Sequence, residues 1–356
     1  MIANVFEIVF HSVIYYVQNF REEYTYFSIK YFSVTHSNKN YFMSKTKQQF
    51  KGRDFISVLD FSTEEIVKIF SLTKAMKKNP RAYRKKLDGK MMMLIFEKPS
   101  LRTHVTFDVG IKQLGGDSLF YASSEKNRIG VRESFYDVAK NLERMVNGIM
   151  IRTFAHNVCT QLAEHANIPV INGLTDLEHP CQAMADYFTV SEFKKDLSKT
   201  KLTFVGDGNN VAHSLMLLAA RIGSTFAVAT PKGYEPNAEI VSQAKEIAKK
   251  TGAKIIITND AVEAVKNADA IYTDVWASMG QESEAETRKK IFLPYQVNAT
   301  LAKNAKSDYL FMHCLPAHRN DEVTDEVIDS KNSVVFQEAE NRLHVQKAIM
   351  YELLRD

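Results

Sequence analysis

The sequence has few cysteines, little net charge and no long apolar run, and each shortage excludes a class of protein. Its 356 residues include three cysteines and no C-x-x-C pair, so we expect neither a disulfide framework nor a zinc cage. Isolated cysteines fit a reducing cytoplasm. A formal net charge of +4 is too small to indicate a nucleic-acid partner. Because no uninterrupted apolar run reaches about 20 residues, we expect no membrane span.

Two nucleotide-binding signatures are also missing. The segment 97–103 lacks the glycine pattern of a P-loop, and 206–210 lacks the G-x-G-x-x-G of dinucleotide-binding folds. We therefore expect neither a P-loop nucleotide site nor a dehydrogenase. The sequence does have an ordinary globular composition, 45% hydrophobic and 25% charged. A chain of this length has room for about two domains.

The first 42 residues differ from the rest of the chain. They hold 12 of its 38 aromatic side chains (22 Phe, 15 Tyr and 1 Trp), and Glu7 and His11 interrupt their apolar start. A positive n-region and a small-residue cleavage site are lacking, so we do not expect a secretory signal. We interpret 1–42 as an N-terminal extension outside the fold, with Met43 as an alternative start. A short partner-binding helix is the other interpretation.

From Phe61 onward, short apolar runs alternate with amphipathic segments. The expected strands are 91–96, 118–122, 148–154 and 168–173, followed by 201–208, 224–231, 254–259, 270–278 and 309–316. Helical patterns separate them, for example in 106–116 and 209–223. This alternation predicts an α/β protein with two parallel-sheet domains. The final segment, 338–356, is an amphipathic helix that we expect to pack back against the first domain.

One polar motif lies between the first strand and the helix after it. Ser100-Leu101-Arg102-Thr103 combines two hydroxyl groups and a guanidinium group at a point where backbone N–H groups lack partners. The positive end of the helix dipole favours an anion there. Helix capping by Ser100 or Thr103 accounts for the same residues, and we weigh the two interpretations equally.

Further polar residues follow later strands of the first unit. Arg152 ends the third strand, where a cation in apolar surroundings needs an anionic partner. His179-Pro180-Cys181-Gln182 opens a helix, and its His and Gln can both donate to an oxygen of a ligand. Ligands of α/β proteins bind at the carboxyl ends of the strands. These residues therefore predict one shared anion site, although each has a structural explanation when taken alone.

The second unit has candidates of another kind. Asn210 carries an amide that could bind a carboxylate or an amine, and Asp274 could hold a cationic amine. The segment Asp274–Gly280 contains the only tryptophan of the chain. His313-Cys314-Leu315-Pro316 ends a strand, and its Leu-Pro step favours a strained or cis peptide. Arg342 opens the final helix and adds another guanidinium group.

Four of these motifs resemble the ornithine carbamoyltransferases, a branch of the aspartate/ornithine carbamoyltransferase family. The motifs are Ser100 to Thr103, His179 to Gln182, Asp274 to Gly280, and His313 to Pro316. The first two are shared with the aspartate carbamoyltransferases, and the last two mark the ornithine branch. The resemblance runs in order from about Met43 to the C-terminus.

The resemblance implies a fold, a reaction and an assembly. It implies that 43–186, completed by 338–356, binds carbamoyl phosphate and that 187–337 binds L-ornithine. The implied reaction transfers the carbamoyl group to the δ-amine of L-ornithine, giving L-citrulline and phosphate, without metal or organic cofactor. The implied enzyme is a cytoplasmic homotrimer, or an assembly of such trimers, of arginine biosynthesis with its sites at subunit interfaces.

The resemblance also assigns roles to residues. The implied carbamoyl phosphate ligands are Ser100, Leu101, Arg102, Thr103, Arg128, Arg152, His179, Gln182, Cys314, Leu315 and Arg342. The implied ornithine ligands are Asn210, Asp274, Ser278 and Met279. The implied catalytic residues are Arg102, Arg152, His179 and Cys314, and we expect Cys314 to orient the amine rather than to attack covalently.

The chain departs from the family pattern at two positions. His104 stands where the family usually has a second arginine, and Arg128 stands where glutamine or histidine usually precedes Ile/Leu-Gly. Two alternatives stay open, and these departures bear on the second of them. One is a carbamoyltransferase acting on putrescine, another diamine or an acylated ornithine, and the other is a non-catalytic carbamoyltransferase-like binding protein.

Overall fold

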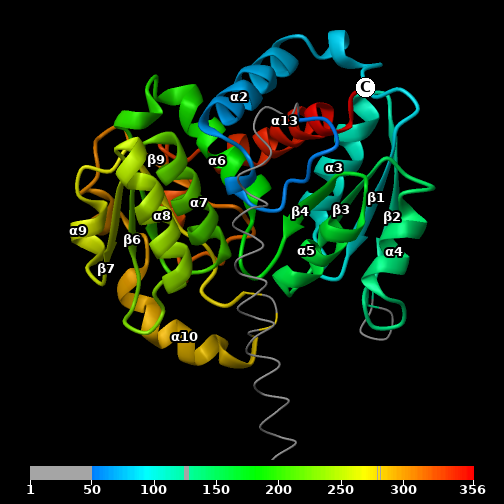
Figure 1. Ribbon diagram of the computed structural model, residues 1–356. Coiled ribbons are helices and arrows are strands. Elements are labelled where there is room, and N and C mark those ends of the chain that lie inside the picture. The colour runs from blue at the N-terminus through cyan, green and yellow to red at the C-terminus, as the bar shows by residue number, and fades with distance from the viewer. Residues whose placement is uncertain (1–49, 124–127, 279, 281) are drawn as a thin grey trace, which may run out of the picture. The chain divides into compact units, whose positions relative to one another are not determined.

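The computed structural model describes residues 50–356 except 124–127, 279 and 281, so the predicted extension 1–42 lies outside the described residues. Lys51–Asp356 form one unit that contains two parallel sheets (Figure 1). The predicted fold class, α/β with two parallel sheets, is confirmed. Within the described ranges, no helix has both the length and the apolar character needed to span a membrane.

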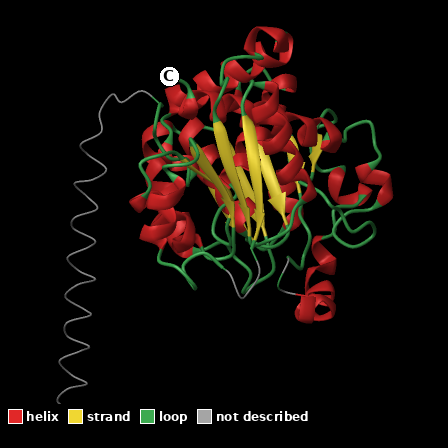
Figure 2. Cartoon of the chain, turned by 90° about the vertical axis from the view of Figure 1, so that its right-hand side faces the viewer, coloured by secondary structure: helices red, strands yellow, loops and turns green. Residues whose placement is uncertain are grey.

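The first sheet has the strand order β2-β1-β3-β4, and all its strands are parallel. Its strands are β1 (Met91–Phe96), β2 (Asp117–Ala122), β3 (Gly148–Arg152) and β4 (Val170–Leu174). Every residue of β3 and β4 is buried, as expected for parallel strands covered on both faces. Figure 2 shows the strands side by side between layers of helices, with the arrowheads toward one end.

Helices connect and cover these strands. They are α2 (Thr63–Lys78), α3 (Leu101–Gln113), α4 (Phe135–Leu142), α5 (His156–His165) and α6 (Pro180–Phe193). Helix α2 begins with a capping box, because Ser62 Oγ accepts from Glu65 N at 3.2 Å while the Glu65 carboxylate accepts from Ser62 N at 2.8 Å. Glu65, in the acidic first turn of α2, is therefore part of the helix cap.

The second sheet has the order β7-β6-β5-β8-β9 and is also parallel throughout. Its strands are β5 (Lys201–Val205), β6 (Thr225–Ala229), β7 (Lys254–Thr258), β8 (Ala270–Tyr272) and β9 (Leu310–Met312). The helices around it are α7 (Asn210–Ile222), α8 (Ala238–Thr251), α9 (Ala261–Val265), α10 (Ala285–Phe292), α11 (Ala299–Ala302) and α12 (Asp325–Ile328). Gly223 ends α7 in the left-handed region at φ 79°, which explains the helix stop that the sequence predicts.

The last helix, α13 (Val335–Leu354), leaves the second sheet and packs against α2, α3 and α6 (Figure 1). Its apolar side chains, such as Val345 and Ile349, are fully buried. Its buried face is also rich in polar groups, including Glu338, Asn341 and Arg342. Buried polar side chains need hydrogen-bond partners. Helix α13 therefore contributes polar groups to the interior as well as apolar packing.

The strands end earlier than the sequence predicts. The predicted strands 148–154 and 270–278 end at Arg152 and Tyr272, and the polar residues after them belong to loops. Helix α3 begins at Leu101, five residues before the predicted start, because Ser100 supplies its cap. Helix α10 was not predicted at all. The shorter strands leave polar residues such as Asp274 in loops at the carboxyl ends of the sheets.

Candidate active site

A cavity of about 1060 Å³ lies at the carboxyl ends of the two sheets. Its walls come from the loops after β1, β3, β5, β8 and β9 and from the starts of α3, α6 and α7. The predicted site residues that line it are Ser100, Leu101, Arg102, Arg152, His179, Gln182, Asn210, Asp274, Ser278, Cys314, Leu315 and Arg342. Motifs that are far apart in the sequence therefore share one cavity.

The start of α3 provides the first wall. Ser100 Oγ accepts from Thr103 N at 3.3 Å, so the capping interpretation is realised. Capping and anion binding are compatible here, because the first-turn amides of Leu101 and Arg102 have no intrahelical partners. Thr103 does not line the cavity and is fully buried behind it.

Three guanidinium groups concentrate positive charge in this cavity. Arg152 Nη1 and Arg342 Nη2 both donate to Thr103 Oγ1, at 3.5 and 3.1 Å. Burial, together with the charges of Arg342 and Arg102, lowers the pKa of Arg152 to about 9. Nε of Arg152 and of Arg342 is buried without a hydrogen-bond partner in the described part of the chain. Since none of the three forms an ion pair with a described carboxylate, the cluster is suited to an anion.

His179 and Gln182 stand at the start of α6. Burial lowers the pKa of His179 well below its ordinary value, and Arg342 and Arg152 add to the effect, so the imidazole is neutral and has one N–H to donate. Gln182 Nε2 donates to Asp186 Oδ1 at 2.8 Å and to Glu338 Oε1 at 3.3 Å. Its Oε1 has no partner among the described residues. The free atom of Gln182 is therefore an acceptor, which suits an N–H of a ligand better than an oxygen.

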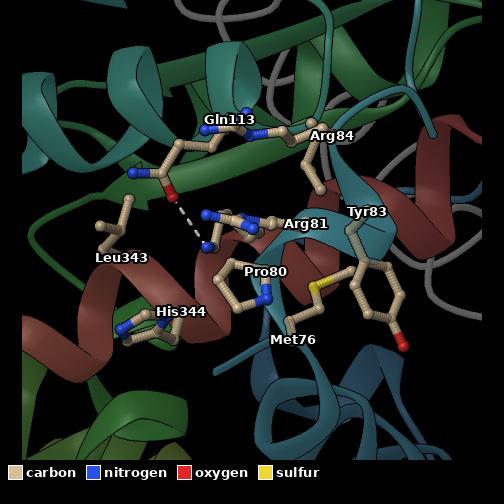
Figure 3. Close-up of a pocket in the computed structure, with 10 residues that line it drawn as sticks. Met76, Pro80, Arg81, Tyr83, Arg84, Gln113, Leu343 and His344 are labelled. Atoms are coloured by element: carbon tan, nitrogen blue, oxygen red, sulfur yellow. Dashed lines mark hydrogen bonds between the residues drawn. The ribbon is translucent and has the colours of Figure 1, made fainter. Parts of the chain in front are cut away.

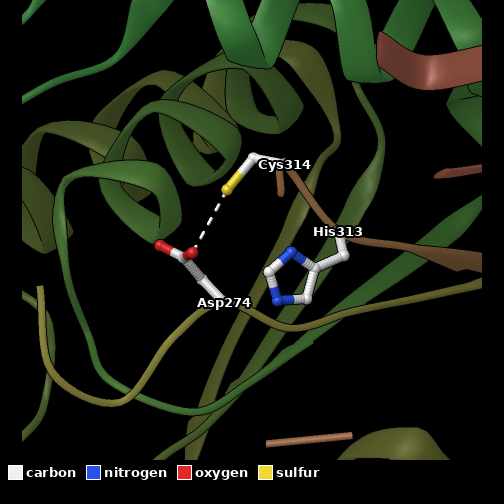
Figure 4. Close-up of side chains that lie close together, drawn as sticks. All are labelled: Asp274, His313 and Cys314. Carbon is white, nitrogen blue, oxygen red and sulfur yellow. Dashed lines mark hydrogen bonds between the residues drawn. The ribbon is translucent and has the colours of Figure 1, made fainter. Parts of the chain in front are cut away.

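Asp274 and Cys314 form the wall that the second sheet provides (Figure 4). Cys314 Sγ donates to Asp274 Oδ1 at 3.1 Å, and Asn209 Nδ2 donates to Asp274 Oδ2 at 2.9 Å. Burial raises the pKa of Cys314 well above its ordinary value, and the Asp274 charge raises it further. Cys314 is therefore a protonated donor and not a thiolate nucleophile.

His313 completes a group of possible metal ligands with Asp274 and Cys314, whose donor atoms lie within 4.8 Å of one another. In this arrangement His313 Nδ1 accepts from Leu315 N at 2.9 Å, and His313 Nε2 lies 3.2 Å from Glu322 Oε1. A metal ion here would have to displace the Leu315 contact and deprotonate the thiol. The side chains present therefore favour an internal hydrogen-bond network over metal coordination.

Leu315 connects the two walls. Its carbonyl oxygen accepts a hydrogen bond from Arg102 Nη2, so an arginine of α3 reaches the loop after β9. The Leu315–Pro316 peptide is cis, as the sequence predicts, and Leu315 has a φ of 57°. This loop holds the backbone of Leu315 and the side chain of Cys314 at the same cavity.

Three predicted residues remain, and only Asn210 is part of the cavity lining as described. Asn210 Nδ2 donates to Thr175 O at 2.6 Å, so its amide is partly engaged within the protein. Arg128 is not part of the cavity lining, and its guanidinium carbon lies 5.0 Å from the ring centroid of Phe154, which does line the cavity. Met279 lies outside the described residues.

Several lining residues were missed by the sequence analysis. Lys98 is buried, forms an ion pair with Asp176, and lies with its Nζ 4.4 Å from the Phe154 ring centroid. Asp207 forms an ion pair with Arg288 of α10 at 2.8 Å. Lys98 lies two residues before Ser100, and its position beside the predicted motif could have indicated that it lines the cavity. No local signal in the sequence links Asp207 to Arg288, which is 81 residues away.

A second, smaller hollow of about 360 Å³ lies between α2, α3 and α13 (Figure 3). Its lining includes Arg81, Arg84 and Lys347, and Lys347 Nζ donates to Gln113 Oε1 at 2.8 Å. None of the predicted site residues lines it.

Two family models match this chain. The aspartate/ornithine carbamoyltransferase carbamoyl-P binding domain matches residues 53–192, and the Asp/Orn binding domain of the same family matches 198–353. The chain belongs to the aspartate/ornithine carbamoyltransferase family. The predicted recognition is thus confirmed.

Relatives within this family are similar over almost their whole length. A protein of Anoxybacillus flavithermus named Ornithine carbamoyltransferase is 52% identical over 309 residues, 86% of this chain and 98% of that protein. The solved ornithine carbamoyltransferase of Pyrococcus furiosus has a TM-score of 0.83 at 48% identity and covers 86% of this chain and 99% of its own. An N-acetyl-L-ornithine transcarbamylase mutant is less similar, with 28% identity, a TM-score of 0.76 and coverage of 84% and 99%.

Proposed function

We propose that this chain transfers the carbamoyl group of carbamoyl phosphate to the δ-amine of L-ornithine, which gives L-citrulline and phosphate. One observation carries the proposal: Arg102, Arg152 and Arg342 line the same cavity as Asp274 and Cys314. A cluster of guanidinium groups suits a phosphoryl group, and a carboxylate suits an amine. The family membership and the relatives named Ornithine carbamoyltransferase support the same reaction.

The phosphate group would bind at the start of α3. The amides of Leu101 and Arg102 and the cap hydroxyl of Ser100 would surround it, while the three guanidinium groups neutralise its charge. Thr103 would act from behind, because its Oγ1 already holds Arg152 and Arg342. These buried guanidinium groups repel one another in the free protein, and a bound dianion removes that repulsion.

The carbamoyl group would lie between His179 and Gln182. When the amine attacks, the carbonyl oxygen becomes an oxyanion, which needs donors placed in advance. The neutral His179 can donate its N–H, and the neighbouring guanidinium groups Arg102 and Arg152 add positive charge. Removing one donor of this kind typically slows the reaction by about 10²–10³-fold.

The amino-acid end of ornithine would bind on the side of Asp274, whose carboxylate suits the cationic α-amine, with Asn210, Ser278 and Met279 as further contacts. The δ-amine must lose a proton before it can attack as the free base. The Cys314 thiol, already hydrogen-bonded to Asp274, would orient the δ-amine without forming a bond to carbon. The departing phosphate is itself a base near the attacking nitrogen and can take up its proton.

A direct assay separates this function from the alternatives. We expect the purified chain to form a carbamoylated product from carbamoyl phosphate and L-ornithine, and to react at least tenfold more slowly with putrescine or N-acetylornithine. A preference for either alternative amine would overturn the substrate assignment. Tight binding of a bisubstrate analogue without turnover would instead indicate the non-catalytic binding protein.

We also propose that the active protein is a homotrimer. Strand β2 is an edge of the first sheet, and its Leu119, Phe120 and Tyr121 are substantially exposed. Leu101 and Val105 of α3 are exposed as well. An exposed apolar edge strand promotes association and is normally covered. His104 stacks on Phe120 at 4.3 Å between ring centroids, so this family departure lies on the proposed interface and not in the cavity lining.

The trimer can be tested by measuring the mass of the purified protein in solution. We expect three copies per particle, or a multiple of three for an assembly of trimers, and Phe120→Asp should lower the mass to that of one chain. A trimeric or larger mass for the variant would show that this face is not the interface.

The proposal has further parts. They are Met43 as the start, the domain limits 43–186 (completed by 338–356) and 187–337, and the cytoplasm as the compartment. An anabolic relative from Pyrococcus furiosus, 50% identical over 302 residues, supports a role in arginine biosynthesis.

A further inference from the structure

Two buried carboxyl groups lie directly behind Gln182, and the mechanism above does not use them. Asp186 is on α6, one turn after Gln182, and Glu338 is on α13. Both are fully buried. Gln182 Nε2 donates to both of them, at 2.8 Å to Asp186 Oδ1 and 3.3 Å to Glu338 Oε1.

Glu338 also ties this acid pair to the second sheet. Tyr272 OH, at the end of β8, donates to Glu338 Oε1 at 3.2 Å, and His313 N, after β9, donates to Glu338 Oε2 at 3.0 Å. The pair therefore connects the backbone next to Cys314 with the side chain of Gln182. On one side the pair contacts Gln182 of α6, and on the other it contacts the backbone after β9.

The pair holds a proton. Burial raises the pKa of Asp186 above its ordinary value and that of Glu338 well above its own, and the charge of Asp186 raises the pKa of Glu338 further. No described cation forms an ion pair with either carboxyl group. Two adjacent buried carboxyl groups do not both ionise near neutral pH, because their charges repel each other in a medium of low polarity.

The pair decides which end of the Gln182 amide faces the cavity. With one proton between them, the carboxyl groups offer mostly acceptor atoms, and the amide NH2 is the end that can satisfy them. The amide oxygen is then left toward the ligand, and Oε1 is the atom without a partner in the described structure. Turning the amide by 180° would place its oxygen against Asp186 and Glu338, at the cost of two hydrogen bonds.

We propose that Asp186 and Glu338 are positioning residues that hold the Gln182 oxygen toward the substrate, and that the site thereby selects a carbamoyl NH2 over a group without N–H. This inference rests on the proposed function. Acetyl phosphate is the matching probe, because a methyl group replaces the NH2 while shape and charge are retained. When acetyl phosphate binds, the Gln182 oxygen faces a methyl group and has no N–H from which to accept. The site therefore rejects acetyl phosphate.

The test is the ratio of the acetyl phosphate inhibition constant to the carbamoyl phosphate dissociation constant. We expect the full-length wild-type protein to bind carbamoyl phosphate at least roughly tenfold more tightly, about the value of one hydrogen bond in a buried site. Asp186→Asn and Glu338→Gln keep the size of each side chain but add an NH2 donor, which lets the Gln182 amide turn. Each should lower the ratio by about fivefold or more.

A merely structural role would weaken both ligands equally and leave the ratio unchanged. Tyr272→Phe is the matched control, because it removes one donor to Glu338 but keeps both acids, and its ratio should stay at the wild-type value. An unchanged ratio in whichever acid variant folds, or a wild-type protein that binds both phosphates equally, would overturn the inference. The comparison of the two phosphates on the wild-type protein needs no variant. Wild-type citrulline synthesis reports on the proposed function separately.

Discussion

Thr103→Val is the substitution that best tests how the three guanidinium groups are held. Thr103 is fully buried, and its Oγ1 accepts from Arg342 at 3.1 Å, from Arg152 at 3.5 Å and from Ser100 Oγ at 3.1 Å. Valine has nearly the same shape but no acceptor, so both guanidinium groups lose their common partner. A hydrogen bond to a charged group is worth about 1.5–3 kcal/mol. Because the second contact is long, we count one such bond.

This value sets the expected size of the effect. Loss of about 1.5–3 kcal/mol corresponds to a fall in kcat/KM for carbamoyl phosphate of roughly 10- to 150-fold. The free protein should also unfold at a lower temperature, since two buried cations lack an acceptor. Saturating phosphate should recover part of that difference, because a bound anion stabilises the folded state and replaces the missing acceptor.

The assay is citrulline formation with carbamoyl phosphate as the varied substrate, together with thermal unfolding with and without phosphate. Thr106→Val is the matched control: Thr106 lies on the same helix and its Oγ1 donates to Arg102 O at 2.8 Å and Thr103 O at 3.2 Å, without a guanidinium contact. If the two variants lose kcat/KM equally, or if Thr103→Val stays within threefold of wild type, the reasoning about the shared acceptor is wrong.

Three further predictions concern other parts of the molecule. Because Cys314 is a donor to Asp274, Cys314→Ser should retain about tenfold more citrulline synthesis than Cys314→Ala; equal loss would argue for a covalent role. Arg128→Gln should raise KM for carbamoyl phosphate if Arg128 reaches the phosphate in the assembled protein, and an unchanged KM would remove it from the site. Burial raises the pKa of Glu178 to about 7, so its stabilising protonated form is fully present below about pH 4.5 and is lost as the pH rises through 7. The free energy of unfolding of Glu178→Gln, measured with urea, should therefore increase relative to wild type between pH 5 and pH 8, by up to about 3 kcal/mol. A difference that does not change with pH would contradict this.

The fold could be predicted because its signals are local. The apolar run 91–96 followed by the cap at Ser100 marks a strand and a helix without any reference to the rest of the chain. The strand ends were less certain, because a second apolar run, 275–277, follows Thr273 and Asp274, and only the pairing of Ala270–Tyr272 with β5 and β9 decides where β8 stops. Helix α10 lacks a side-chain cap hydrogen bond, which explains why its start gave no signal.

The site could be predicted only in part. Arg102, Arg152 and His179 lie at or after the ends of strands and were expected to converge, because parallel strands present their carboxyl ends at one edge. The direction of the Gln182 amide could not be read from the motif, since it depends on Glu338, 156 residues later. The environment of Asp274 likewise depends on Cys314, 40 residues away. Contacts between distant segments set the protonation and the hydrogen-bond polarity of these groups.

Helix α13 makes completion of the cavity depend on a segment that follows both sheets. Arg342 and Glu338 come after every described strand in the sequence, yet one lines the cavity and the other accepts a hydrogen bond from Gln182. A nascent chain that has completed only its first sheet thus has the loop at Ser100 and Arg102 but neither of these later partners. The full set of lining groups is therefore assembled only after α13 has packed against α2, α3 and α6.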